Sequence, residues 1–268
     1  MFGNPWIAAL FALFAWWFST GIILLVVRKA DASGVNSHRL LVVLTIPLFA
    51  LGVAGLVLSA TALTVINVYI AFLSVLLVWG WIELAFLSGV ITGPEQRPCP
   101  VGMTGWARFK RAWHTLSYHE LLLLIGVLVV TVATTGAENE FGFSAYLILF
   151  GARISAKLNL FFGVPRINTE FVPAQLQHLK SYFRQGNITA IFVIGITFLS
   201  LATAWFGQHL IGAETAPDIA GYSLLTTLAA LATLEHWLMV IPLPDAKLWR
   251  WMLPSLPSTS KTGQSHEL

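Results

Sequence analysis

Long runs of apolar residues alternate with short polar segments along most of the chain. A transmembrane helix needs about 20 consecutive, mainly apolar residues. Seven runs meet that length or approach it: Pro5–Val27, Leu40–Ala60, Asn67–Ile91, Tyr118–Thr135, Phe143–Val164, Ile188–Ile211 and Ile219–Leu243. The pattern predicts an all-α fold, a polytopic membrane bundle of about seven transmembrane helices that occupies residues 1–254. The polar, Pro/Ser-rich residues 255–268 predict a disordered tail.

Composition agrees with this class of protein. Hydrophobic residues make up 57% of the chain and charged residues only 10%, which is too little charge to cover the surface of a soluble domain. The formal net charge is +3, and the basic residues lie where membrane topology places them. We therefore expect the lipid bilayer as a partner and no nucleic acid.

Lysine and arginine are distributed unevenly between the connecting segments. Thirteen of the 15 lie in segments that alternate to one side of the membrane. The segments of the other side hold none, and instead carry Glu138, Glu140, Glu214 and Asp218. Because basic residues stay on the cytoplasmic side, the pattern predicts an N-terminus outside and a cytoplasmic C-terminus. This arrangement requires an odd number of spans.

The two remaining basic residues, Arg153 and Lys157, lie within the fifth run. They are four residues apart and therefore share one face of a helix, with Asn159 in the same region. Ionisable groups inside a membrane cost several kcal/mol unless they are paired or solvated. Both residues are therefore candidates for a functional site.

Carboxylates and histidines in three other runs are placed to meet them. Glu83 and Glu235 each lie eight residues before the predicted cytoplasmic end of their span, and His236 follows Glu235. His119 and Glu120 lie at the start of the fourth span. These groups fall in the cytoplasmic half of the bundle. The sequence thus predicts that four helices place charge at a shared level.

Three interpretations of this cluster remain open. In the first, Arg153 and Lys157 only neutralise Glu83 and Glu235. In the second, they bind an anionic group, such as a lipid phosphate or a tetrapyrrole propionate. The third is a metal site, because carboxylate and imidazole are ligands that iron uses, although no Glu-x-x-His spacing occurs. The candidate metal ligands are Glu83, His119, Glu120, Glu235 and His236, and the candidate cofactor-binding residues are Arg153, Lys157, Asn159, His119 and His178.

A histidine could also supply an axial nitrogen to the magnesium of a chlorophyll. His119, His178 and His236 are the candidates for that role. The cofactor expectation is thus a bacteriochlorophyll or a precursor, with iron as the alternative.

Two cytoplasmic connections carry further patterns. After Pro173, apolar residues recur at helical spacing from Leu176 to Phe183, which predicts a short amphipathic helix on the membrane surface. The segment from Gly93 to Arg111 is Pro/Gly-rich and then basic and aromatic, and its end is expected to begin an interfacial helix that leads into the fourth span.

Several uncommon motifs resemble those of a known family. They are Gly151–Pro165 (GARISAKLNLFFGVP), Trp81–Gly89 (WIELAFLSG), Ile91–Pro94 (ITGP), Tyr118–Leu121 (YHEL), Ser181–Arg184 (SYFR) and Leu234–Trp237 (LEHW). In their order along the chain they are similar to the motifs of the PuhE-type photosynthetic complex assembly proteins, over about Phe18 to Trp251. Arg166 departs from the family pattern, in which asparagine commonly follows Gly-Val-Pro.

The resemblance implies a multi-pass protein of the inner (intracytoplasmic) membrane of anoxygenic phototrophic bacteria. Its implied role is in assembly of the reaction-centre and light-harvesting apparatus, with photosynthetic or pigment-biosynthesis proteins as partners. A buried polar pocket would then handle bacteriochlorophyll or its precursors. The alternative function is that of a metal-dependent, di-iron-like membrane oxidoreductase that acts on a tetrapyrrole or a carotenoid.

Overall fold

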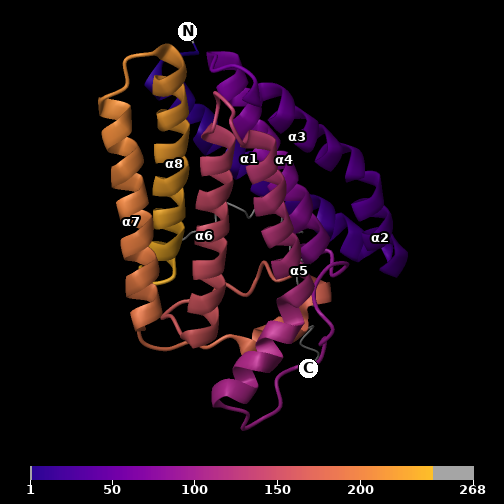
Figure 1. The fold of residues 1–268 in the computed structure, drawn as a ribbon. Coiled ribbons are helices and arrows are strands. Elements are labelled where there is room, and N and C mark those ends of the chain that lie inside the picture. The colour runs from indigo at the N-terminus through magenta and orange to yellow at the C-terminus, as the bar shows by residue number, and fades with distance from the viewer. Residues whose placement is uncertain (1, 244–268) are drawn as a thin grey trace, which may run out of the picture.

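The computed structural model describes residues 2–243, and within them every regular element is a helix. The helices run side by side in one bundle, with the N-terminus at one end and the longest connections at the other (Figure 1). Their bounds are α1 Pro5–Ser33, α2 Val35–Leu44, α3 Ile46–Ala60, α4 Val65–Leu87, α5 Gly105–Thr134, α6 Phe141–Phe162, a 3₁₀ helix η1 Ala174–Tyr182, α7 Ala190–Ile211 and α8 Ala216–Leu238.

Six of these helical segments are long and apolar enough to cross a membrane, with α2 and α3 counted together as one span. The seventh traverse of the bundle is α8, which packs against α1, α6 and α7. It is less apolar because it carries Asp218, Glu235 and His236. The prediction of a helical membrane bundle is confirmed, while the seventh span stays a prediction. The predicted tail, and the residues from 244 onward, lie outside the described part of the chain.

Several helix ends differ from those predicted, and four of them bear on the site. Helix α1 continues to Ser33, and α5 begins at Gly105, thirteen residues before the predicted start at Tyr118. The expected interfacial helix is therefore the first part of α5 itself. In contrast, α4 ends at Leu87 and α8 at Leu238, earlier than predicted. Glu83 and Glu235 consequently lie only four and three residues from the ends of their helices, nearer to the end of the bundle than expected.

The second predicted span is broken where its proline suggests. Pro47 has no N–H to continue the helical ladder, and the helix is interrupted at Thr45 between α2 and α3. The freed carbonyl of Val42 accepts from the Thr45 hydroxyl at 3.1 Å and from the Trp81 indole at 3.2 Å. A broken helix is tolerated in a membrane when neighbouring side chains satisfy its backbone in this way.

Helix α4 lies at the centre of the bundle, where it packs against α1, α3, α5, α6 and α8. Its residues Phe72, Val75 and Ile82 are almost fully buried. On the periphery, large apolar side chains such as Leu58 and Ile194 remain exposed. In a membrane bundle these outward-facing apolar side chains contact lipid.

The end of the molecule opposite the N-terminus carries the two long connections, α4–α5 and α6–α7, and is here called the basic end (Figure 1). The described basic residues of these connections and of the first part of α5 are Arg97, Arg108, Lys110, Arg111, Arg166, Lys180 and Arg184. The fold therefore brings these two predicted cytoplasmic segments together.

The single cysteine, Cys99, tests which side this end faces, because it lies in the α4–α5 connection and is partly accessible. We expect a membrane-impermeant maleimide to label it in inside-out vesicles and not in intact spheroplasts. Labelling from the periplasmic side alone would reverse the predicted orientation.

The segment between α6 and α7 folds under the basic end of the bundle. Its helix η1 is a 3₁₀ helix rather than the predicted α-helix. Leu176 and Leu179 are buried against Phe86 of α4, so the apolar side of η1 faces protein instead of lipid headgroups. The Arg108 guanidinium donates to the Tyr182 carbonyl at 2.7 Å, and the Cys99 N–H donates to the Ser181 hydroxyl at 2.8 Å.

Arg166 fixes the start of this segment to the end of α8. Its guanidinium donates to the carbonyls of Leu238, Ile241 and Leu243, and its N–H donates to the Met239 carbonyl at 2.9 Å. A cation at a helix C-terminus is favourable because the last carbonyls carry a partial negative charge. The segment is therefore held at both ends, by α8 and by α5.

Candidate functional site

Both basic residues of α6 form ion pairs with carboxylates on neighbouring helices. Arg153 Nη2 lies 2.6 Å from Glu83 Oε2 of α4. Lys157 Nζ pairs with Glu120 of α5. The simplest interpretation expected Glu235 as the second partner, and the structure differs because the shared face of α6 is turned toward α4 and α5. The Lys157 and Arg153 side chains also lie over the Phe86 ring, with centroid distances of 5.6 and 5.7 Å.

His119 is fully buried beside the Glu83 pair. Its ring stacks on Phe86 with a centroid distance of 4.2 Å, and its Nε2 is 3.7 Å from Glu83 Oε1. This separation is too long for a hydrogen bond, and neither ring nitrogen has a hydrogen-bond partner. His119 therefore packs behind the ion pairs.

His236 and Asn159 belong to a second polar group between α6 and α8. His236 Nδ1 contacts the Ala232 carbonyl at 2.8 Å, and Nε2 contacts the Ser155 hydroxyl at 3.0 Å. Asn159 is fully buried, and its amide is 3.5 Å from the same hydroxyl. Both ring nitrogens of His236 are thus already engaged.

His178 lies in η1, apart from the ion pairs. Burial lowers the pKa of its imidazole below the usual value, so the ring is neutral at physiological pH. Its buried Nε2 has no hydrogen-bond partner. It does not line the cavity described below.

The five candidate metal ligands do not converge. Among residues 2–243, no three His, Cys, Asp or Glu side chains are grouped so that they could hold a metal ion. Glu83 and Glu120 face cations, and His236 is hydrogen-bonded to Ser155. The placement gives the di-iron interpretation no support.

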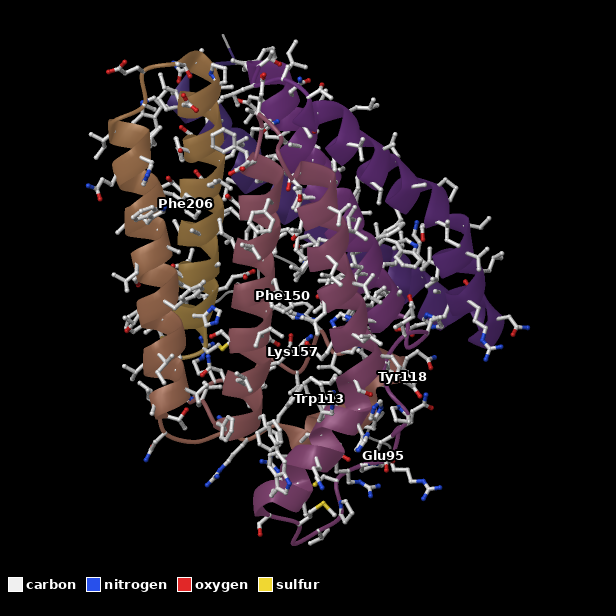
Figure 2. The ribbon with its side chains drawn as sticks, in the orientation of Figure 1. Glu95, Trp113, Tyr118, Phe150, Lys157 and Phe206 are labelled. Atoms are coloured by element: carbon white, nitrogen blue, oxygen red, sulfur yellow. The ribbon has the colours of Figure 1, made fainter. Side chains whose placement is uncertain are left out.

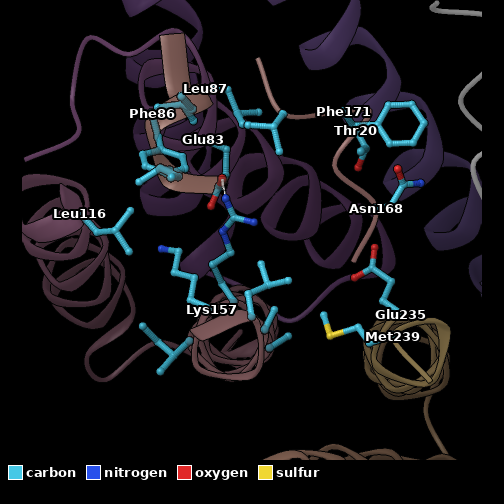
Figure 3. A pocket seen from close by; sticks show the side chains of 18 of the residues that line it. Thr20, Glu83, Phe86, Leu87, Leu116, Lys157, Asn168, Phe171, Glu235 and Met239 are labelled. Atoms are coloured by element: carbon cyan, nitrogen blue, oxygen red, sulfur yellow. Dashed lines mark hydrogen bonds and ion pairs between the residues drawn. The ribbon is translucent and has the colours of Figure 1, made fainter. Parts of the chain in front are cut away.

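A cavity of about 900 Å³ opens beside the ion pairs, at the basic end of the bundle. Its wall is formed by α1, α4, α5, α6 and α8, and its floor by residues 166–183 of the α6–α7 segment. Lys157, Leu116 and Phe86 lie on one side of it (Figure 3). In the whole molecule, Lys157 and Trp113 both lie toward the basic end, far from Phe206 (Figure 2). Most of the lining side chains are apolar.

Glu235 lies on the opposite side of the cavity from Lys157. The carboxylate points toward Thr20 of α1 and Asn168 of the α6–α7 segment (Figure 3). The Glu235 side chain is exposed, and it lines the cavity. The Trp16 side chain hydrogen-bonds to it. Both predicted polar positions near the end of α8 therefore line the cavity, but His236 is hydrogen-bonded to Ser155.

Several lining residues were not foreseen from the sequence. Trp16 and Thr20 lie in a helix whose pattern is uniformly apolar, so no periodicity distinguishes its cavity-facing side. Asn168 lies in a connection that was expected to be a surface element. Phe86 is part of the Trp81–Gly89 motif, which is the one signal that could have identified it.

Comparison with known proteins places the chain in a family. The model of the family described as "Protein of unknown function (DUF3623)" matches residues 2–260. A protein of Rhodobacter capsulatus, named "Uncharacterized 30.4 kDa protein in puhA 5'region", is 47% identical over 259 residues, which are 97% of this chain and 94% of the relative. No solved structure matches the chain. The resemblance to PuhE-type proteins is confirmed, and the chain belongs to the DUF3623 family.

Proposed function

We propose that this membrane protein binds a bacteriochlorophyll or a precursor in the cavity at its basic end, and that it serves assembly of the photosynthetic apparatus. The observation that carries the proposal is the cavity itself. Small-molecule sites occupy about 300–1,000 Å³ and are mainly apolar with a few polar groups, and the cavity of about 900 Å³ fits that description. Ion pairing alone does not require an empty space of this size.

The polar groups of the cavity suit an amphipathic ligand. Arg153 uses Nη2 for Glu83, and its buried Nε has no hydrogen-bond partner. A guanidinium has five N–H donors, so Arg153 retains donors for a carbonyl or carboxylate of the ligand. The apolar side chains around it suit a macrocycle or a hydrocarbon tail.

The photosynthetic context supports the choice of ligand. The relative from Rhodobacter capsulatus is named for its place in the puhA 5' region, and the motifs of this chain resemble those of photosynthetic complex assembly proteins. Reaction-centre, light-harvesting or pigment-biosynthesis proteins are then the partners, and the intracytoplasmic membrane is the location.

Filling the cavity tests the proposal. Thr20→Trp, which places a large ring into the cavity from α1, is expected to reduce the pigment that co-purifies with the protein at least about tenfold, a loss of about 1.4 kcal/mol in binding. The measurement is the absorbance spectrum of protein purified from a phototrophic host. Ile22→Trp is the matched control, because Ile22 is on the same helix and points away from the cavity.

The assembly role has its own readout in cells. Cells that lack the protein are expected to lose reaction-centre and light-harvesting absorbance. The wild-type and Ile22→Trp proteins should restore it, whereas Thr20→Trp should not. Purified wild-type protein without pigment, and unable to take up added pigment, would contradict the binding proposal.

A further inference from the structure

The charged groups of the cavity wall do not balance one another. Lys157 and Arg153 are paired with Glu120 and Glu83. The third cation of the wall, Arg166, binds main-chain carbonyls at the end of α8. Glu235 therefore forms no ion pair with a described residue, and the nearby charge that acts on it belongs to Arg153, which is already paired with Glu83. Its hydrogen-bond partner, Trp16, is neutral.

A carboxylate without an ion-pair partner inside a membrane bundle is costly. The cost falls when a cation or a metal ion of a ligand contacts the carboxylate. Because Glu235 is exposed to the cavity and directed across it, a bound molecule can reach its oxygens without displacing another side chain. The Glu235 carboxylate is therefore placed to contact a bound ligand.

The histidines do not compete for that role. Both nitrogens of His236 are engaged by Ala232 and Ser155. His119 and His178 do not line the cavity. Among the residues that do, no imidazole nitrogen within the described chain is free to coordinate a metal of a bound ligand.

We propose that Glu235 is the axial ligand for the magnesium of a tetrapyrrole bound in the cavity. The proposal rests on the proposed function and assigns the metal contact to an oxygen, in place of the expected histidine nitrogen. Magnesium is a hard cation that prefers oxygen ligands. Trp16 would orient the carboxylate through its hydrogen bond, as partners outside the coordination sphere commonly do.

One other carboxylate of the lining also has no cation contact among the described residues. Glu170 lies in the α6–α7 segment, outside the helices, and its side chain is exposed. It therefore provides the matched comparison, because Glu170→Leu removes a carboxylate from the same cavity at a different place.

The test compares two ligands that differ only in the metal. Full-length protein in detergent micelles is titrated with chlorophyllide a and with its magnesium-free counterpart, pheophorbide a, and quenching of tryptophan fluorescence gives the affinities. We expect the wild type to bind the magnesium form at least about tenfold more tightly. Glu235→Leu, which leaves no oxygen ligand at this position, should remove this preference, while Glu170→Leu should keep it.

The outcomes separate the two proposals. Equal affinity of the wild type for both ligands would overturn the role of Glu235 and leave the proposed function standing, and this comparison needs no variant. Binding of neither ligand would overturn both. Loss of the preference in Glu170→Leu instead of Glu235→Leu would overturn the assignment. Unchanged affinity of Glu235→Leu for pheophorbide a is the expected sign that the variant is folded.

Discussion

Arg153→Met is expected to lower the free energy of unfolding by about 3 kcal/mol. Removing one partner of a buried ion pair costs about 3–5 kcal/mol, because the other charge is left unpaired. Here the group left unpaired is Glu83, whose side chain is 10% exposed. The lower end of the range applies because Arg153 is 31% exposed and faces the cavity, where water can enter. The variant also loses the contact of the guanidinium with the Phe86 ring. Chemical unfolding in detergent micelles measures the effect.

A second substitution in the same pair should reverse much of this loss. In Arg153→Met/Glu83→Gln no charge remains unpaired, so we expect the double variant to be more stable than Arg153→Met alone. Arg111→Met is the control, because the pair of Arg111 with Glu95 lies outside the bundle, at 26% and 22% exposure. A pair of that kind contributes about 0–1 kcal/mol. Equal losses for Arg153→Met and Arg111→Met would contradict the view that Arg153 and Glu83 form a buried pair.

Gly93→Ala is expected to destabilise the protein by about 3 kcal/mol, the upper part of the usual range for overpacking. A Cβ at position 93 would lie 2.0 Å from the His114 carbonyl oxygen and 2.8 Å from the Thr115 carbonyl carbon. Both are main-chain atoms of α5, so no side chain can move aside to make room. The α4–α5 connection would have to move away from α5.

That displacement would break three main-chain hydrogen bonds. The Thr92 carbonyl accepts from the N–H groups of Tyr118 and His119 at 2.9 and 3.0 Å, and the Glu95 N–H donates to the His114 carbonyl at 3.3 Å. Gly186→Ala is the matched control, because nothing lies within 4 Å of the added Cβ and its φ is not positive. We expect it to change the free energy of unfolding by less than about 0.5 kcal/mol. A Gly93→Ala protein as stable as Gly186→Ala would show that the connection does not pack on α5 as described.

Hydropathy predicts the spans well because lipid imposes the same requirement on each of them. It fails at the start of α5, where Arg108, Lys110 and Arg111 interrupt the apolar run although the helix is continuous. These residues lie beyond the hydrocarbon region, where a helix needs no apolar surface. A hydropathy window therefore detects where the apolar run begins, but it does not detect where the helix begins.

The level of the charged cluster was predictable, but its pairing was not. Position along each span was enough to bring Arg153 and Lys157 near three carboxylates. The choice of Glu120 over Glu235 depends on the rotation of α6 about its own axis, which turns the face of Arg153 and Lys157 toward α4 and α5. Packing against neighbouring helices decides that rotation, and the residue spacing along α6 does not specify it. The cavity floor was missed for a related reason, since η1 buries its apolar side against Phe86, which lies 90 residues earlier in the chain than Leu176.

The α6–α7 segment leaves the bundle and returns to it at nearly the same place. Val164 and Gln185 form a β-bridge, and the Arg184 N–H donates to the Leu160 carbonyl at 2.8 Å. Loops whose ends are this close tolerate changes in length and composition, because the helices they join need not move. Selection can therefore alter the floor of the cavity without affecting insertion of the chain into the membrane. Among relatives, divergence in ligand preference is expected to concentrate in residues 166–180, between the two shared motifs, while the helices that hold the cavity change slowly.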